Sequence, residues 1–242
     1  MKNIVCLWSC PRNISTALMY SFAQRHDTIV HDEPLYAHYL RVSGANHPGR
    51  DAVLNNLESD GNKVVNDVIL KKSNKWLFHK LMTHFLVEIN KNFLNLVHNI
   101  IFIRNPYEII HSYSKVIANP SIDDIGIKSQ YYLYQHLIKI GNPPIVLDSK
   151  YLLKSPEFIL KKICSILKMP FEKKMLKWKK GGILEDGVWA KYWYHNVHNS
   201  TCFLPYKKNN IELSSNNLDL AEQSLLYYNF LTCKSIKDDT KI

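Results

Sequence analysis

The sequence predicts an α/β protein with a three-layer, doubly wound architecture, in which helices cover both faces of a mainly parallel sheet. One reason is that short apolar runs alternate along the chain with segments of helical periodicity. Another is that two of these runs, Ile4–Trp8 and Ile100–Ile103, each end in a polar loop that leads into a helical pattern. The length of 242 residues and the hydrophobic fraction of 46% suit a full core. We therefore expect one domain over residues 1–233 and a frayed tail at 234–242.

The chain begins with one strand and one helix. Ile4–Trp8 is continuously apolar, as expected for a strand that is buried on both faces of a sheet. Ser15–Arg25 then gathers its apolar residues on one helical face, and Ser15 or Thr16 is available to cap the first turn. The helix should therefore begin directly at the loop.

The following segment is less regular. Thr28–Val30 predicts a short strand, and Leu35–Leu40 predicts a helix. Arg41–Asn62 is rich in Ser, Gly, Asn and Asp, which predicts an irregular excursion with one short helix near Ala52–Leu57. Lys63–Asp67 is expected to return to the sheet as a strand.

The middle of the chain predicts a helix, a strand and a second helix. Lys75–Asn92 carries large apolar residues at helical spacing, namely Trp76, Leu77, Leu81, Phe85 and Ile89. Asn99–Arg104 is an apolar strand. Pro106 suits the first turn of a helix, where its missing N–H breaks no hydrogen bond, and this helix is expected to continue to Ala118.

The C-terminal part is mostly helical. Ile122–Ile140 predicts a helix, and Asn142-Pro143-Pro144 separates it from a strand at Ile145–Leu147. Three further segments show helical periodicity, namely Pro156–Leu167, Lys173–Lys180 and Asp219–Phe230.

Two loops at strand ends carry residues that suit phosphate groups. In Pro11-Arg12-Asn13-Ile14-Ser15-Thr16, an arginine and two hydroxyls lie at the start of a helix, whose first N–H groups and positive dipole end favour an anion. The second loop has Arg104 and Pro106, with Ser112 eight residues after the arginine. In the alternative interpretation, Ser15 or Thr16 only caps the helix, and the arginines are solvated. A Walker loop is excluded because Gly-Lys-Ser/Thr is missing.

Charge and cysteine content limit the partners. The formal net charge of +10 favours anionic ligands, but the lysines are scattered, so we expect a small molecule and not nucleic acid as the partner. No apolar run approaches eighteen residues, and the N-terminus turns polar by Ser9, so neither a membrane span nor a signal peptide is expected. The five cysteines form no Cys-x-x-Cys pair, which predicts no metal site and a reducing, cytoplasmic compartment.

These motifs resemble the sulfotransferases that use 3′-phosphoadenosine 5′-phosphosulfate. Pro11 to Thr16 is similar to their 5′-phosphosulfate loop, and Arg104, Pro106 and Ser112 are similar to their 3′-phosphate motif. Residues 146–171 resemble the family's next strand, turn and proline-started helix. The segment Glu185-Asp186-Gly187-Val188-Trp189-Ala190 resembles a bacterial and plant subgroup that is loosely named aminotransferase-like. The resemblance implies the P-loop-like sulfotransferase fold, without a metal.

The resemblance also implies roles for individual residues. The donor nucleotide would be held by Arg12, Asn13, Ile14, Ser15, Thr16, Arg104 and Ser112. Arg12 would stabilise the charge that develops on the leaving 5′-phosphate. The general base that takes a proton from the hydroxyl or amine of the acceptor is expected among His31, Asp32 and Glu33, with Glu33 the best positional match and His31 the alternate.

Two departures from the family leave a second interpretation open. Ile14 replaces the usual glycine of the first loop, and the strand predicted at Lys63–Asp67 lacks the lysine of the subgroup's Lys-Asp-Met ending, since Asn66 stands there. The chain is therefore expected to be a sulfotransferase or, alternatively, a catalytically weakened nucleotide-binding or regulatory protein of the same fold. A small-molecule kinase is a third, less favoured hypothesis.

Overall fold

The computed structural model describes residues 3–207 and 211–238, and its centre is a parallel sheet. The strands are β1 (Ile4–Ser9), β2 (Thr28–Asp32), β3 (Trp76–Met82), β4 (His98–Ile103) and β5 (Ile145–Asp148). Their order is β2-β3-β1-β4-β5, and each neighbouring pair runs parallel. The predicted mainly parallel sheet is confirmed.

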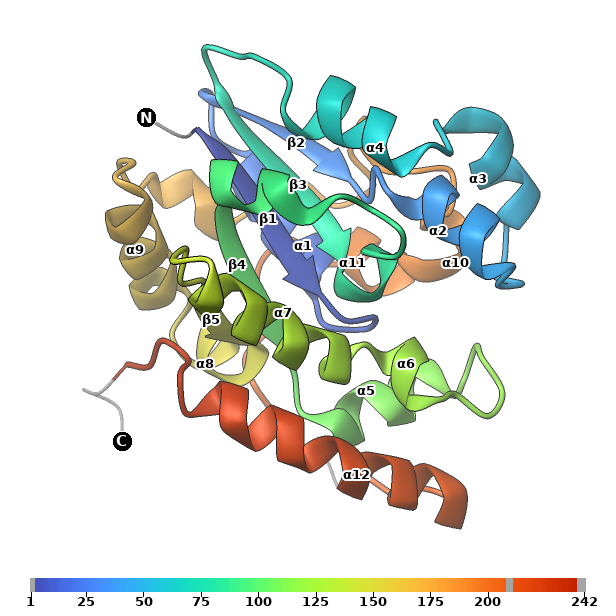
Figure 1. Cartoon of the computed structure of the whole chain (residues 1–242). Coiled ribbons are helices and arrows are strands. Elements are labelled where there is room, and N and C mark those ends of the chain that lie inside the picture. Colours follow the sequence, from blue (N-terminus) through green and yellow to red (C-terminus); the bar gives the residue numbers. More distant parts are fainter. Residues whose placement is uncertain (1–2, 208–210, 239–242) are drawn as a thin grey trace.

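Helices cover both faces of this sheet, which confirms the three-layer prediction (Figure 1). The longer helices are α1 (Ser15–Ala23), α2 (Tyr36–Ser43), α3 (Arg50–Asn56), α5 (Pro106–Tyr113), α7 (Ile127–Lys139), α9 (Pro156–Leu167) and α12 (Ser215–Thr232). The short ones are α4 (Gly61–Val64), α6 (Ile122–Ile125), α8 (Ser149–Lys154), α10 (Ala190–Trp193) and α11 (His195–His198).

Side chains of β1 alternate between two apolar cores. Cys6 and Trp8 pack with residues of α2, α5, α7 and α12 on one face. Val5 and Leu7 pack with α1 and α9 on the other. A strand buried on both faces reads as a continuous apolar run, which is why β1 and β4 were predictable from the sequence.

The strand predicted at Lys63–Asp67 is wrong. These residues belong to α4 and to a π-helical turn over Val65–Ile69. The reason is local, because Asp60 caps the segment by accepting hydrogen bonds from the backbone N–H groups of Asn62 and Lys63.

The helix predicted at Lys75–Asn92 is also wrong. Trp76–Met82 forms β3, which lies between β1 and β2 in the sheet. From Leu77 to Met82 every side chain is buried, so the apolar residues face both sides of a central strand and match helical spacing by coincidence. Two 3₁₀ turns follow, at Thr83–Phe85 and Lys91–Leu96.

Several predicted helices exist with different bounds. α5 ends at Tyr113, five residues before Ala118. The segment Ile122–Ile140 is split into α6 and α7 at Gly126, whose φ of 71° is left-handed. Lys173–Lys180 contains only a 3₁₀ turn over Lys173–Leu176.

In the C-terminal tail, the backbone N–H of Ile236 donates to the carbonyl of Val146 at 2.9 Å. Residues 239–242 lie outside the described part of the chain. Across the described residues, none of the helices combines the length and the apolar character that crossing a membrane requires.

Candidate active site

The loop between β1 and α1 places a helix N-terminus at the carboxyl end of the sheet. Within the described part of the chain, no side chain caps α1, and its N-cap residue is Ile14. Ser15 and Thr16 are the first residues of the helix itself, so they do not cap it, contrary to the alternative interpretation. The first N–H groups of α1 are therefore left for a ligand.

The loop backbone is held in an unusual conformation. Arg12 and Ile14 have left-handed φ values of 58° and 50°. The position at which the sequence departs from the family's glycine is thus one that does adopt a glycine-like conformation. The Asn13 side chain is buried and donates to the carbonyl of Phe102 on β4, so it anchors the loop to the neighbouring strand.

The second loop follows β4 and starts α5. Asn105 caps this helix by accepting from the N–H of Tyr107 at 2.9 Å, and Pro106 occupies the first turn. Arg104 donates through Nη1 to the carbonyl of Arg12 at 2.5 Å and forms an ion pair with Glu108 at 2.7 Å. The two predicted phosphate loops are therefore in direct contact.

One cavity of about 760 Å³ connects the predicted donor residues. Its walls include Arg12, Asn13, Ile14, Ser15, Thr16, Arg104 and Ser112. Glu33 also lines it, and the backbone of Glu33 is left-handed with a φ of 43°. Non-glycine residues in this conformation often gather at functional sites.

His31 is not among the residues that line this cavity. Its ring stacks on that of His79, with a centroid distance of 4.7 Å. Burial lowers its pKa, with a smaller contribution from the charge of Lys71. Of the three candidates His31, Asp32 and Glu33, the structure brings only Glu33 to the cavity wall.

Lys80 lines the cavity and lies between two carboxylates. Its Nζ is 2.8 Å from Oδ1 of Asp32 and 2.5 Å from Oε1 of Glu33, and its side chain is 1% exposed. It also donates to the hydroxyl of Tyr194 at 2.6 Å. Charges this deeply buried persist only when they are paired and hydrogen-bonded, as these are.

This arrangement shifts the pKa values of its members. Burial raises the pKa of Glu33, the charge of Lys80 opposes this effect, and the charge of Asp32 adds to it, so that the net shift is upward. Burial alone would lower the pKa of Lys80, but the charges of Asp32 and Glu33 raise it above its usual value. A carboxyl with a raised pKa in a cavity suits a general base.

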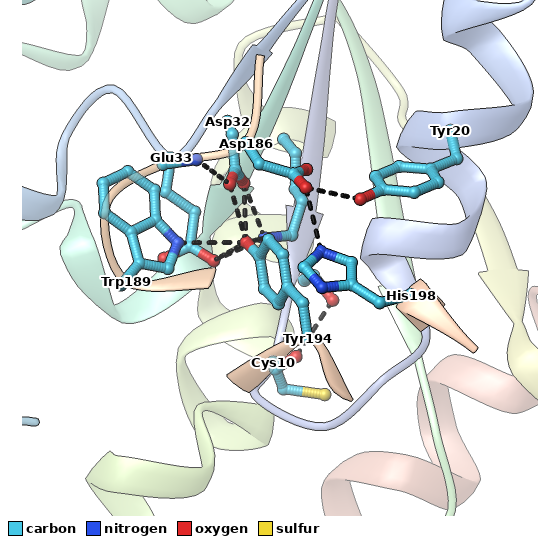
Figure 2. A network of polar contacts seen from close by, with 11 residues as sticks. Cys10, Tyr20, Asp32, Glu33, Asp186, Trp189, Tyr194 and His198 are labelled. Carbon is cyan, nitrogen blue, oxygen red and sulfur yellow. Dashed lines mark hydrogen bonds and ion pairs between the residues drawn. The ribbon is translucent and has the colours of Figure 1, made fainter. Parts of the chain in front are cut away.

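A C-terminal segment, residues 186–198, is bonded to the same carboxylates (Figure 2). The Tyr194 hydroxyl donates to Asp32 at 2.8 Å and accepts from the indole N–H of Trp189 at 3.0 Å. The N–H of Gly187 donates to Oδ2 of Asp32 at 3.1 Å. Asp186 accepts from Tyr20 at 2.5 Å and lies 3.0 Å from Nε2 of His198, which ties the segment to α1.

Sequence reasoning missed Lys80 and the hydrogen bond from Tyr194 to Asp32. Lys80 falls within the helix predicted at Lys75–Asn92, and the strand predicted at Lys63–Asp67 has Asn66 where the subgroup has its lysine. The strand that follows the excursion is β3, and it ends Lys80-Leu81-Met82, so a lysine does stand two residues before its closing methionine. That Lys-x-Met pattern was the available signal. For Tyr194 no local signal existed, because its partners come from β2 and β3.

One group of side chains among residues 3–207 and 211–238 has ligand atoms close enough for a metal ion, namely His26, Asp27 and Glu172. It does not line the cavity. Arg25 is 2.8 Å from Asp27 and 3.4 Å from Glu172, so a cation already neutralises both carboxylates.

Comparison with known proteins agrees with the fold. A family model described as a sulfotransferase domain matches residues 1–235. Among solved structures, the sulfotransferase domain from the curacin biosynthetic pathway is 18% identical, with a TM-score of 0.53 over 92% of this chain and 97% of that one. The sulfotransferase domain of the Synechococcus PCC 7002 olefin synthase is 15% identical, with a TM-score of 0.55 over 91% and 93%. At these identities the likeness shows the fold alone.

Two Arabidopsis thaliana proteins are more similar in sequence. Branched-chain-amino-acid aminotransferase-like protein 1 is 43% identical over 230 residues, and protein 2 is 39% identical over 233 residues. These matches cover 94% and 95% of this chain but 41% of each relative. The chain thus spans less than half the length of the curated relatives it matches.

Proposed function

Because this chain belongs to the sulfotransferase domain family, we propose that it transfers a sulfuryl group from 3′-phosphoadenosine 5′-phosphosulfate to a small-molecule acceptor. The observation that carries the proposal is that both phosphate loops and Glu33 line one cavity. A donor with phosphate groups at two positions matches two arginine-bearing loops in contact, and an acceptor needs a base at the same cavity.

The donor side offers the groups that a bisphosphorylated nucleotide requires. Arg12 and Arg104 supply guanidinium donors, and the uncapped N-terminus of α1 supplies backbone N–H groups with the positive end of the helix dipole. Burial lowers the pKa of Arg12, and the nearby charge of Arg104 acts in the same direction. A phosphate group between the two arginines would relieve their repulsion.

In the proposed reaction, Glu33 takes the proton of the acceptor as the new bond to sulfur forms. The bond from sulfur to the phosphate oxygen breaks at the same time, and that oxygen keeps the electron pair. Arg12 and the α1 N-terminus stabilise the resulting negative charge, as fixed cations do in phosphoryl transfer. The raised pKa of Glu33 makes its carboxylate a stronger proton acceptor than an exposed one.

The rival hypothesis is a nucleotide-binding or regulatory protein without transfer activity. One of its two sequence arguments was the missing lysine, and the presence of Lys80 two residues before the end of β3 weakens that argument. A kinase remains disfavoured, because the first loop has no lysine and no glycine-rich approach.

Thermal denaturation with 3′-phosphoadenosine 5′-phosphate, ATP and AMP tests donor recognition. At a hundredfold excess over the dissociation constant, a bound nucleotide stabilises by about 2 to 3 kcal/mol, which corresponds to a Tm increase of about 5 to 10 °C. We expect this shift for the bisphosphate only, and its loss in Arg104→Ala. An equal response to ATP would contradict the proposal. Release of the bisphosphate from the labelled donor then separates an enzyme from a binding protein.

A further inference from the structure

The carboxylate of Glu108 is bound to the arginine that is expected to hold the 3′-phosphate of the donor. Its Oε2 accepts from the Nε–H of Arg104 at 2.7 Å, and its Oε1 accepts from the hydroxyl of Tyr206 at 3.2 Å. The side chain of Glu108 is 13% exposed and lines the donor cavity together with Arg104 and Ser112. An anion of the protein itself therefore occupies Arg104.

A phosphate group at Arg104 competes with this carboxylate in two ways. A guanidinium binds an oxyanion best through two parallel N–H groups, and Glu108 takes the Nε–H of one such pair. Nη1 is also engaged, because it donates to the carbonyl of Arg12 at 2.5 Å. In addition, the negative charge of Glu108 repels a phosphate, more strongly in a partly buried cavity than in water. Full contact between Arg104 and a phosphate therefore requires that Glu108 moves away.

A second cavity, of about 450 Å³, offers the carboxylate another place. It shares Glu108 and Tyr206 with the donor cavity, and its walls include Lys150 and Lys154 of α8. Within the described part of the chain, Glu108 is the only acidic residue among these walls. A carboxylate that leaves Arg104 can therefore turn toward two ammonium groups.

The buried carboxylate next to α8 is bonded to other groups. Asp148 is 0% exposed and lines neither cavity. It accepts from the hydroxyls of Tyr228 at 2.7 Å and Thr232 at 2.8 Å, and from the backbone N–H of Lys150 at 2.8 Å. These bonds come from hydroxyls and the backbone, so they do not use the ammonium groups of the two lysines.

We propose that Glu108 sets the selectivity for the donor nucleotide, because its carboxylate competes with the second phosphate for Arg104 and is displaced by it toward Lys150 and Lys154. This inference rests on the proposed donor recognition and assigns a residue that limits it. A nucleotide with one phosphate leaves Glu108 in place. When a bisphosphate leaves, the carboxylate returns to Arg104 and neutralises its charge.

Glu108→Gln tests the competition, because glutamine keeps the shape and an acceptor oxygen but removes the charge. Binding of 3′-phosphoadenosine 5′-phosphate and of AMP is measured by calorimetry. We expect the variant to bind the bisphosphate at least about fivefold more tightly and AMP within about twofold of wild type. Glu157→Gln is the control, since it removes an exposed acid from an equivalent pair with Lys161 on α9 and should change neither affinity.

Unchanged or weaker binding of the bisphosphate by Glu108→Gln would overturn the inference. Weaker binding would show that the carboxylate positions Arg104 for the phosphate. An equal gain for AMP would show a general effect of charge without selectivity for the second phosphate.

A double-mutant cycle tests where the carboxylate goes. Lys150→Met with Lys154→Met should weaken bisphosphate binding about threefold when Glu108 is present, because the displaced carboxylate loses its new partners. In the Glu108→Gln background the same two substitutions should have no effect. An equal loss in both backgrounds would mean that the lysines attract the nucleotide directly. That result, or no loss in the presence of Glu108, would contradict the proposed displacement.

Failure of the inference and failure of the proposed function give different results. If wild type binds the bisphosphate but Glu108→Gln does not bind it more tightly, the role of Glu108 is wrong and donor recognition stands. If neither protein binds it, the proposed function is wrong and the inference fails with it. Binding by Glu108→Gln alone would support the competition and contradict sulfuryl transfer by the wild-type chain.

Discussion

The Nε–H of Arg12 donates to the hydroxyl of Ser112 at 2.9 Å, so this bond joins the two predicted phosphate loops in addition to the bond from Arg104 to the carbonyl of Arg12. Nη1 of the same guanidinium donates to the carbonyl of Trp193 at 3.1 Å. Arg12 thus connects the first loop, α5 and the segment that carries Tyr194.

Arg12→Ala should reduce turnover more than donor affinity. Arg12 is the group proposed to stabilise charge that develops only during transfer, so we expect kcat to fall about 10²- to 10³-fold. Bisphosphate binding, which also uses Arg104 and the α1 N-terminus, should weaken by a smaller factor. Initial rates and thermal shifts measure the two effects. Arg41→Ala, an exposed arginine away from the cavity, is the control. Turnover of Arg12→Ala within about threefold of wild type would refute the role.

Asp32→Asn should move the acid limb of the kcat/KM profile to lower pH. The carboxylate of Asp32 raises the pKa of Glu33, and its removal leaves Lys80 to pair with Glu33 alone. Both changes favour the ionised base, which then persists to lower pH. In wild type this limb should lie above 4.5, the ordinary value for glutamate. A limb that stays in place, or one that moves to higher pH, would show that Glu33 is not the titrating base.

Lys80→Met should destabilise the fold by about 3 to 5 kcal/mol, because it leaves two buried carboxylates without their counterion. Chemical denaturation measures the change. Lys63→Met removes an equal charge from the exposed pair with Glu58 and should have little effect. The triple variant Lys80→Met with Asp32→Asn and Glu33→Gln should recover part of the loss. A small effect of Lys80→Met would mean that the carboxylates are protonated in the native state.

Position 14 should be more stable with glycine than with alanine. Both substitutions remove the partly buried Ile14 side chain, but only glycine adopts the observed φ of 50° without steric cost. The left-handed conformation costs an L-residue about 1 to 2 kcal/mol. The free energy of unfolding of Ile14→Gly should therefore be higher than that of Ile14→Ala by about 1 kcal/mol. Paired denaturation curves provide the comparison. If alanine is equal or better, the loop does not hold this conformation in solution.

His79→Phe should flatten the pH dependence of stability between pH 6.5 and 3. Burial lowers the pKa of His79 to about 3, so in this range the unfolded chain binds a proton that the native protein does not. The contribution of His79 to the free energy of unfolding is fully present above pH 6.5. Below that pH it falls by about 1.4 kcal/mol for each pH unit. Denaturation at several pH values should show a shallower slope in the variant. An unchanged slope would show that a group other than His79 binds the proton on unfolding.

The residues predicted for the donor side lie together because each part of that prediction is local. An apolar strand, a loop with Arg12, and a helix that begins at Ser15 are consecutive in the chain, and Arg104 and Ser112 belong to one strand end and its helix. The prediction of β3 failed because a strand buried on both faces and a buried helix give similar apolar patterns. Because of that error, the sequence did not place Lys80 at the end of a strand beside Asp32 and Glu33.

By itself, the sequence determined β1, β4 and the loop and helix that follow each of them, since strand, loop and helix follow from neighbouring residues. The tertiary structure alone decided which acid reaches the cavity and in which direction its pKa is shifted. Glu33 acquires its raised pKa from burial, from Asp32 beside it and from Lys80 on the adjacent strand, with Tyr194 bonded from a distant segment. A pKa depends on the distances between charges and on the exclusion of water, and both exist only after the chain has folded.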